Sequence, residues 1–175
     1  MDLKKFIRSI PDYPKKGILF RDITTLIKDP DAFKFATDQI LMISKNLKFD
    51  KIAAIESRGF VFASTVAYLL NKPLILFRKK NKLPAERISV DFKLEYGEAT
   101  IEVHKDSISK KERILIIDDL IATGGTAEAA AKLVELSGGL VAGFIFIVNL
   151  FDLPGNDLLK KKSYFTKSLI DFPGH

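Results

Sequence analysis

The chain has 175 residues, of which 47% are hydrophobic, and its formal net charge is +6. That length suits one buried core and is short for two, so we expect a single domain over residues 1–175. The lysines are spread along the chain without a basic stripe or a DNA-binding motif, so the charge favours an anionic small molecule over nucleic acid as partner.

Cysteine is absent, which excludes disulfides and thiolate metal sites, and two histidines argue against a histidine-rich zinc site. Any metal should therefore be a hard cation held by oxygen. No apolar run approaches the roughly 20 residues that span a bilayer, and residues 1–5 lack the apolar core of a signal peptide. We expect a cytoplasmic protein with no membrane partner.

The first predicted element is a helix that begins after Asp29, which suits the N-cap, with Pro30 at the first helical position. Its apolar residues fall at helical spacing: Phe33, Ala36, Ile40, Ile43 and Leu47. A strand over residues 52–55, a turn over residues 56–59 and a second helix through Leu70 follow. Another strand over residues 74–77 completes a unit that favours a right-handed parallel α/β sheet.

The segment between Arg78 and Lys93 is charged and poorly periodic, which indicates a surface loop. Residues 88–95 and 100–104 flank Gly97 and are typical of an antiparallel hairpin. Loops of this length often close over active sites, so we predict a lid over about residues 78–97.

The next predicted strand covers residues 114–117 and ends at two adjacent carboxylates, Asp118 and Asp119. A Thr-Gly-Gly-Thr turn then leads into a helix over residues 126–136. Residues 141–148 should form the last buried strand, and the tail over about residues 152–175 carries only weak signals.

This strand, turn and helix predict a phosphate site, because the free N–H groups at the start of a helix lie beside the positive end of its dipole. The chain contains neither Gly-x4-Gly-Lys-Ser/Thr nor Gly-x-Gly-x-x-Gly, which argues against the nucleoside triphosphatase and dinucleotide-binding patterns. The alternative is that Asp118 and Asp119 only end a strand and cap the next turn.

The apolar run followed by Asp-Asp-x-x-Ala-Thr-Gly-Gly-Thr resembles the phosphoribosyl pyrophosphate signature of the type I phosphoribosyltransferases. Four further motifs resemble, in the same order, those of the adenine-specific branch of that family: Phe20-Arg21-Asp22-Ile23, Glu56-Ser57-Arg58-Gly59-Phe60, Arg78-Lys79 with Lys82-Leu83-Pro84, and Leu94-Glu95-Tyr96-Gly97. The resemblance covers about residues 4–150. It implies the type I phosphoribosyltransferase fold, a central parallel sheet flanked by helices with a hairpin and lid loop over the active site.

The resemblance also implies roles for the phosphosugar donor. The 5′-phosphate would lie in the loop of Ala122, Thr123, Gly124, Gly125 and Thr126. Asp118 and Asp119 would face the ribose hydroxyls and the positive charge at the anomeric carbon, which is an electrostatic role. The pyrophosphate set would be Ser57, Arg58, Arg78, Lys79 and Lys82. A Mg²⁺ ion held mainly by substrate and water would share this charge.

For the base, the resemblance implies that the carbonyl of Leu19 accepts from the adenine amino group, that the N–H of Arg21 donates to ring N1, and that Phe20 stacks. Glu95 would carry a proton at the base, while Tyr96 packs over the reacting centre. The other interpretations stay open: Phe20 as a core residue, Glu95 as an exposed strand residue, and the lid cations, Arg87 among them, as solvated surface.

The implied reaction is a Mg²⁺-dependent transfer of the 5-phosphoribosyl group from phosphoribosyl pyrophosphate to adenine, giving AMP and pyrophosphate in purine salvage. Two alternatives are the same transfer to another purine, and a nucleotide-sensing regulator built on the same fold. The family is usually dimeric, and Phe60 and Phe62 are candidates for that contact or for the helical core. The chain departs from the family at Phe92, at Asn149 and in residues 156–175.

Overall fold

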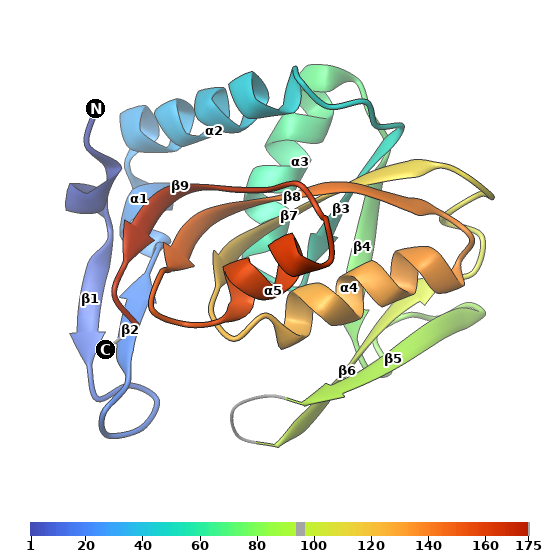
Figure 1. Ribbon diagram of the computed structural model, residues 1–175. Coiled ribbons are helices and arrows are strands. Elements are labelled where there is room, and N and C mark those ends of the chain that lie inside the picture. The colour runs from blue at the N-terminus through green and yellow to red at the C-terminus, as the bar shows by residue number, and fades with distance from the viewer. Residues whose placement is uncertain (94–96, 175) are drawn as a thin grey trace.

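The computed structural model describes residues 1–93 and 97–174, and its main feature in this part of the chain is a seven-stranded sheet (Figure 1). The strand order is β5-β6-β4-β3-β7-β8-β9. Five strands run parallel: β3 (Lys51–Ile55), β4 (Leu74–Lys79), β7 (Arg113–Ile121), β8 (Leu140–Leu150) and β9 (Thr166–Phe172). The hairpin of β5 (Arg87–Lys93) and β6 (Glu98–His104) joins β4 antiparallel, which confirms both the parallel α/β sheet and the predicted hairpin.

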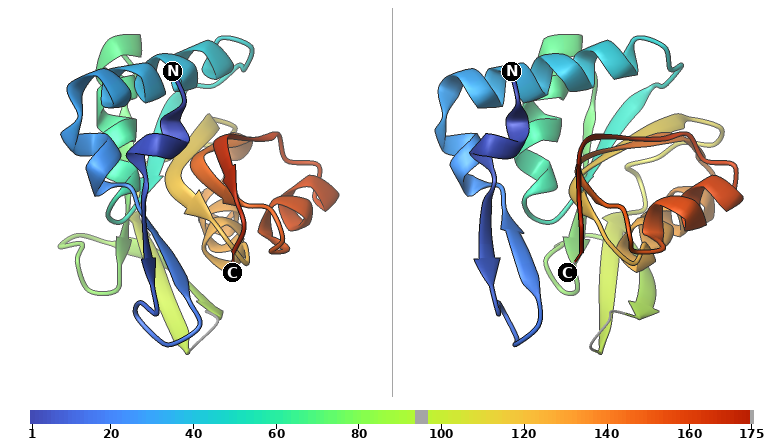
Figure 2. Two further views of the ribbon diagram at one scale, coloured as in Figure 1. Left: turned by 90° about the vertical axis from the view of Figure 1, so that its left-hand side faces the viewer. Right: turned by 60° about the vertical axis from the view of Figure 1, so that its left-hand side comes forward.

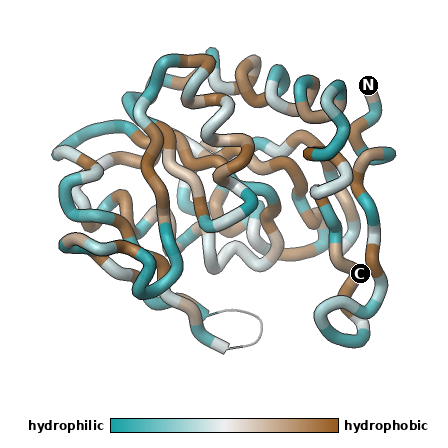
Figure 3. Tube along the Cα trace, turned by 180° about the vertical axis from the view of Figure 1, so that it is seen from behind, coloured by the Kyte–Doolittle hydropathy of each residue, from teal (hydrophilic) through white to brown (hydrophobic). Residues whose placement is uncertain are grey.

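Helices cover both faces of the sheet, as two of the views show (Figures 1 and 2). One core lies under α2 (Pro30–Ser44) and α3 (Gly59–Leu70) and includes Ile52 and Ala54 of β3. The other lies under α4 (Gly125–Leu136) and α5 (Gly155–Lys161) and includes Ala53 and Ile55 of the same strand. Successive strand residues point to opposite faces, so a strand between two helical layers must be apolar throughout. Figure 3 shows this hydrophobic centre with hydrophilic loops around it.

The start of α2 follows from its capping residues. The Asp29 side chain accepts a hydrogen bond of 2.9 Å from the N–H of Ala32, and Pro30 occupies the first turn, as predicted. In α3, Phe62 is fully buried and contacts Phe33 of α2 at 5.4 Å between ring centroids. Phe62 is therefore a core residue, and the interpretation of it as a dimer contact is wrong.

The N-terminal region forms a small unit beside the main sheet (Figure 2). It comprises η1 (Leu3–Phe6), β1 (Arg8–Pro11), β2 (Leu19–Asp22) and α1 (Thr24–Lys28). The strands β1 and β2 pair antiparallel in a two-stranded sheet of their own. The short, mixed pattern of these strands carries no strong periodic signal, and the unit was not predicted.

Three strand predictions needed correction. Strand β7 does not end before Asp118 but continues to Ile121, because its pairing with β8 continues through Asp118↔Phe146 and Ile121↔Asn149. Asn149 accordingly lies within β8 instead of after it. Strand β8 is not the last, because β9 pairs with it in parallel and forms the edge of the sheet. Among the described residues, no helix is both long and apolar enough to cross a membrane.

Candidate active site

A cavity of about 660 Å³ lies at the carboxyl ends of β3 and β7. Ligand sites of parallel α/β sheets form at this edge, because the loops that follow adjacent strands diverge there. The cavity collects residues from the strand β2, the turn after β3, the end of β7 and the loop before α4. Its lining includes half of the predicted site residues: Phe20, Ser57, Arg58, Asp118, Asp119, Ala122, Thr123, Gly124 and Thr126.

The two carboxylates are buried together, Asp118 being 8% and Asp119 7% exposed. Burial, and then the neighbouring Asp119 charge, raise the pKa of Asp118 well above its usual value. Burial also raises the pKa of Asp119, against the opposing effect of Arg58. Arg58 Nε forms an ion pair with Asp119 Oδ2 at 2.7 Å, but this oxygen accepts no hydrogen bond among the described residues. The site concentrates negative charge that the protein only partly neutralises.

Gly59 brings the start of α3 against the carboxylates. A Cβ atom at this position would lie 2.7 Å from Asp118 Oδ1 and 2.9 Å from the carbonyl oxygen of Ile117. The helix can therefore approach β7 this closely only with glycine. The positive end of the α3 dipole consequently faces Asp118 and favours its ionised form, which opposes the effect of burial. The sequence reasoning placed Gly59 in a turn but did not assign this role to it.

The loop before α4 has the form of an anion cradle. Gly124 adopts φ +93° at the N-cap, and Gly125 begins the helix without a side-chain capping bond. The first N–H groups of α4 are thus free of side-chain capping and lie at the cavity. Gly125 itself packs under the hairpin, where a Cβ would lie 2.7 Å from the carbonyl oxygen of Lys93.

Gly155, at the start of α5, supports this loop from behind. Its N–H donates to the carbonyl of Ala122 at 2.9 Å, and a Cβ there would collide with that oxygen and lie 2.7 Å from Gly124 N. The residue was missed because it lies in the weakly patterned tail. The Pro154-Gly155 pair was its only local signal.

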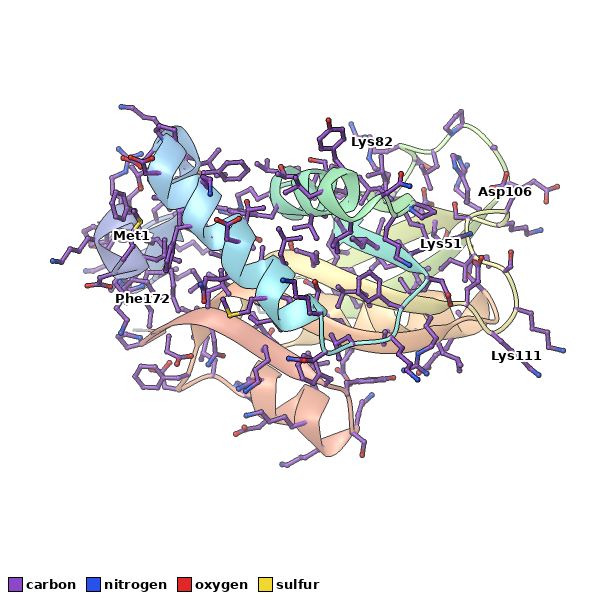
Figure 4. The ribbon with its side chains drawn as sticks, turned by 90° about the horizontal axis from the view of Figure 1, so that it is seen from above. Met1, Lys51, Lys82, Asp106, Lys111 and Phe172 are labelled. Atoms are coloured by element: carbon purple, nitrogen blue, oxygen red, sulfur yellow. The ribbon has the colours of Figure 1, made fainter. Side chains whose placement is uncertain are left out.

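The predicted pyrophosphate residues are only partly brought together. Ser57 and Arg58 line the cavity, and the peptide between Glu56 and Ser57 is cis. Lys79 lines a second cavity of about 720 Å³, which shares Glu56 and Thr126 with the first. Arg78 lines neither cavity, and exposed Lys82 lies at the outside of its loop (Figure 4).

Glu56 connects the turn after β3 to the end of β4. Its Oε2 accepts from Arg78 Nε at 2.9 Å and from the N–H of Lys79 at 2.8 Å. Burial opposes ionisation of Glu56, but these donors outweigh it and lower the pKa. Glu56 therefore holds the end of β4, where the predicted lid would begin.

Arg87 was predicted to be a lid residue, but in the structure its side chain contacts Glu102 across the hairpin of β5 and β6. Its Nε donates to Glu102 Oε1 at 3.1 Å, and Glu102, 2% exposed, also accepts from Ser89 and from the N–H of Asn81. Arg87 lines neither cavity. The predicted residues Glu95 and Tyr96 lie outside the described residues.

The strand β2 presents Phe20 to the cavity and the neighbouring side chains elsewhere. The Phe20 ring is half-buried, with Arg58 Cζ 5.2 Å and the Tyr13 ring 5.1 Å from its centroid. The alternation of a strand then turns the side chains of Leu19 and Arg21 to the other face. What Leu19 and Arg21 can offer the cavity is their backbone.

The chemistry of the site suits a phosphorylated, positively polarised ligand with Mg²⁺. The carboxylates of Asp118 and Asp119 are hard oxygen donors, and Asp119 Oδ2 lacks a hydrogen bond among the described residues. The free N–H groups of α4 suit a phosphate, and Arg58 suits a second anion.

Comparison with known proteins identifies the family. A family model described as phosphoribosyl transferase domain matches residues 27–173. An adenine phosphoribosyltransferase of Pelagibacter ubique is 73% identical over the whole of both chains. The crystal structure of adenine phosphoribosyltransferase from Thermoanaerobacter pseudethanolicus is 46% identical, with a TM-score of 0.93 over 98% of each chain. That of the Saccharomyces cerevisiae enzyme, complexed with an imino-altritol bisphosphate and adenine, is 32% identical, with a TM-score of 0.88 over 97% of each chain. The chain belongs to the phosphoribosyltransferase family and, within it, to the adenine phosphoribosyltransferases.

Proposed function

We propose that the chain transfers the 5-phosphoribosyl group from phosphoribosyl pyrophosphate to adenine, forming AMP and pyrophosphate. One observation carries this proposal: a single cavity holds a buried carboxylate pair, a phosphate cradle, an arginine and an aromatic strand residue. The yeast relative that has been crystallised with adenine supports the choice of base.

In the proposed reaction, the loop of Ala122 to Thr126 binds the 5′-phosphate, and Asp118 and Asp119 face the ribose. The bond from the anomeric carbon to pyrophosphate breaks first, and N9 of adenine then forms the new bond and loses its proton. Anions below the sugar stabilise the positive charge that develops between these events. Glu95 is the proposed proton carrier, and Tyr96 is proposed to cover the reacting centre.

Pyrophosphate departure needs cations on the opposite side of the sugar. We assign this role to Arg58 with Ser57 and to three residues of the proposed lid, Arg78, Lys79 and Lys82. Glu56 holds the first two of these in place through its hydrogen bonds. Arginine contacts a phosphate in a bidentate way, whereas lysine acts as a point charge. Mg²⁺, held by substrate oxygens near Asp118 and Asp119, would supply further neutralisation of the pyrophosphate.

Base selectivity is proposed to come from the backbone of β2. The carbonyl of Leu19 and the N–H of Arg21 pair with the amino group and N1 of adenine, while Phe20 stacks on the ring. A 6-oxopurine would present an acceptor to the Leu19 acceptor and leave both unpaired, which can discriminate by about 10⁴-fold. The same transfer to another purine is therefore the alternative that a panel of bases tests.

We also propose a cytoplasmic homodimer. The exposed apolar residues Tyr68 and Leu69 of α3, 85% and 53% exposed, lie on the face that we assign to the second copy. A multiply charged donor such as phosphoribosyl pyrophosphate does not cross membranes unaided, which supports a cytoplasmic location. Sedimentation equilibrium of the pure protein measures the assembly, and a monomer at micromolar concentration would contradict it.

The activity is tested by incubating the protein with Mg²⁺, phosphoribosyl pyrophosphate and one base at a time, and separating the products by chromatography. Adenine should give AMP and stoichiometric pyrophosphate, whereas hypoxanthine, guanine and xanthine should give little nucleotide. Reactions without phosphoribosyl pyrophosphate are the control. No AMP from adenine would overturn the proposal, and faster turnover of another purine would replace the base.

A further inference from the structure

The side chain of Arg21 connects the N-terminal strand β2 to the other end of the chain. Arg21 is 6% exposed and points away from the cavity that its neighbour Phe20 lines. Its Nη1 donates to Ser9 Oγ at 2.5 Å, and its Nη2 donates to the carbonyl of Pro173 at 2.8 Å. The guanidinium also lies over the Phe172 ring, 4.5 Å from the centroid. One side chain thus joins residues 152 positions apart in the sequence.

The segment that receives Arg21 is itself fixed to the main sheet. Phe172 ends β9 and accepts from the N–H of Phe151 at 3.0 Å, and the N–H of Gly174 donates to Asp152 Oδ1 at 2.6 Å. Figure 4 shows Phe172 beside the N-terminal segment. Burial lowers the pKa of the Arg21 guanidinium, while the nearby Asp152 carboxylate raises it and favours the charged form. Because Phe172 and Gly174, on either side of Pro173, are both hydrogen-bonded to residues 151–152, the carbonyl of Pro173 is an acceptor held at a defined place.

This connection has a mechanical consequence. Strands β1 and β2 form a two-stranded sheet that is separate from the seven-stranded sheet within the described residues. A two-stranded hairpin is marginally stable on its own, so its position depends on what it packs against. The Arg21 contacts tie β2 to the edge strand β9, and through β8 to the strand β7 that carries the carboxylates.

We propose that Arg21 and residues Phe172–Gly174, together named the tail latch, position the backbone of Leu19–Arg21 and thereby set the affinity for the base. This inference rests on the proposed function, in which that backbone reads adenine. Arg21 acts as a positioning residue, because only its backbone faces the ligand while its side chain grips the tail. Released from the tail, β2 shifts relative to the cradle, and adenine binding weakens while the donor site stays intact.

Two variants test the latch, Arg21→Lys and Phe172→Ala, because both leave every backbone group of β2 in place. Lysine keeps the charge but cannot reach Ser9 and Pro173 at once, and alanine removes the ring beneath the guanidinium. For each variant, KM for adenine should rise about tenfold, while KM for phosphoribosyl pyrophosphate stays within about twofold. The double variant should resemble the single variants, since both break one connection.

Matched controls separate the latch from a general loss of stability. Phe151→Ala removes a ring that is 60% exposed beside the same strand, and Arg113→Lys alters an arginine at the opposite end of the sheet. Both controls should leave the two KM values unchanged. Thermal melting of all variants verifies folding, and if Arg21→Lys does not fold, Phe172→Ala carries the test.

The outcomes separate the two proposals. If wild type makes AMP but Arg21→Lys and Phe172→Ala raise both KM values equally, or neither, Arg21 is only a structural residue and the inference is wrong. Additive effects in the double variant would likewise overturn it. If wild type makes no AMP from adenine, the proposed function fails, and this inference fails with it.

Discussion

Residues 118–126, which comprise the carboxylate pair and the loop before α4 and are together called the cradle below, contribute to the same cavity as strand β2. The two regions are built differently. The cradle is continuous in sequence, and one strand, one turn and one helix start create it. The strand β2 depends on Arg8 and Ser9 of its neighbour and on Pro173 at the other end of the chain. The part of the cavity formed by residues 118–126 is thus encoded locally, whereas the part formed by β2 is assembled by long-range contacts.

Two buried aspartates, one in each region, differ in how their charge affects the stability of the folded protein. Burial and the neighbouring acid raise the pKa of Asp118 in the cradle. At Asp22 in β2, burial also works to raise the pKa, but hydrogen bonds from Arg8 and Thr24 outweigh it and lower the pKa to about 2. The charge of Asp118 therefore lowers the stability of the folded protein, whereas the charge of Asp22 stabilises the strand β2.

The largest expected effect follows from removing the cradle charge. Asp118→Asn should lower kcat by about 10² to 10³-fold, because the stabilising anion is lost. The same change should raise the melting temperature at pH 7. A carboxyl whose pKa is higher in the folded protein destabilises it once pH exceeds its ordinary value, and asparagine carries no such charge. Asp119→Asn should also lower kcat, and the two effects should not add.

Steady-state assays and calorimetry at pH 7 measure both quantities. Full activity in the double variant would exclude the electrostatic role of the pair. A lower melting temperature for Asp118→Asn would show that the carboxylate is stabilising, and it would remove the energetic contrast with Asp22.

An intermediate effect is expected from Gly155→Ala, because residue 155 lies outside the cradle in sequence but packs against it. The new Cβ would collide with the Ala122 carbonyl, so the loop before α4 must move. KM for phosphoribosyl pyrophosphate should rise about tenfold or more, with KM for adenine nearly unchanged. Gly139→Ala is the control, because its Cβ would also be crowded, 2.7 Å from the side-chain atom Ile108 Cγ2, but at the opposite end of the sheet. Equal KM changes in both variants would contradict the buttress role of Gly155.

The smallest effect concerns the contribution of Asp22 in β2 to the stability of the protein. Since the folded pKa of Asp22 is about 2 against an ordinary 3.8, its contribution is complete above about pH 4 and is lost as pH falls towards 2. Asp22→Asn should lower the free energy of unfolding at pH 7 by about 1 to 2 kcal/mol, a value reduced by the exposure of Arg8.

Urea unfolding of Asp22→Asn at pH 7 and at pH 2.5 measures this contribution, which should shrink at the lower pH. Asp38→Asn is the control, because its pair with Lys34 is exposed and should contribute less than about 0.5 kcal/mol. An equal loss of unfolding free energy in both variants would show that Asp22 stabilises the protein no more than an exposed ion pair does.

The elements whose signals are local could be predicted from the amino-acid sequence. Asp29 and Pro30 start α2 as predicted, because a capping bond and a fixed φ act within one turn. The strand β3, the hairpin of β5 and β6, and the phosphate loop likewise follow from runs of a few consecutive residues. The site residues gathered at the cavity come mostly from such runs, since the carboxyl ends of adjacent parallel strands necessarily meet.

Features that depend on distant partners emerge only once the chain is folded. Strand β7 continues through Asp118 and Asp119 because β8 pairs with it there, although two adjacent acids predict the end of a strand. Strand β9, with its exposed Lys167, is a strand because β8 offers it an edge. Arg87 turns towards Glu102 because that buried carboxylate needs donors, and buried Arg21 reaches Pro173 because its guanidinium needs acceptors. A local sequence pattern predicts the geometry of one turn or strand. The partner of a buried charge can lie far away in the sequence, so it is defined only by the folded structure.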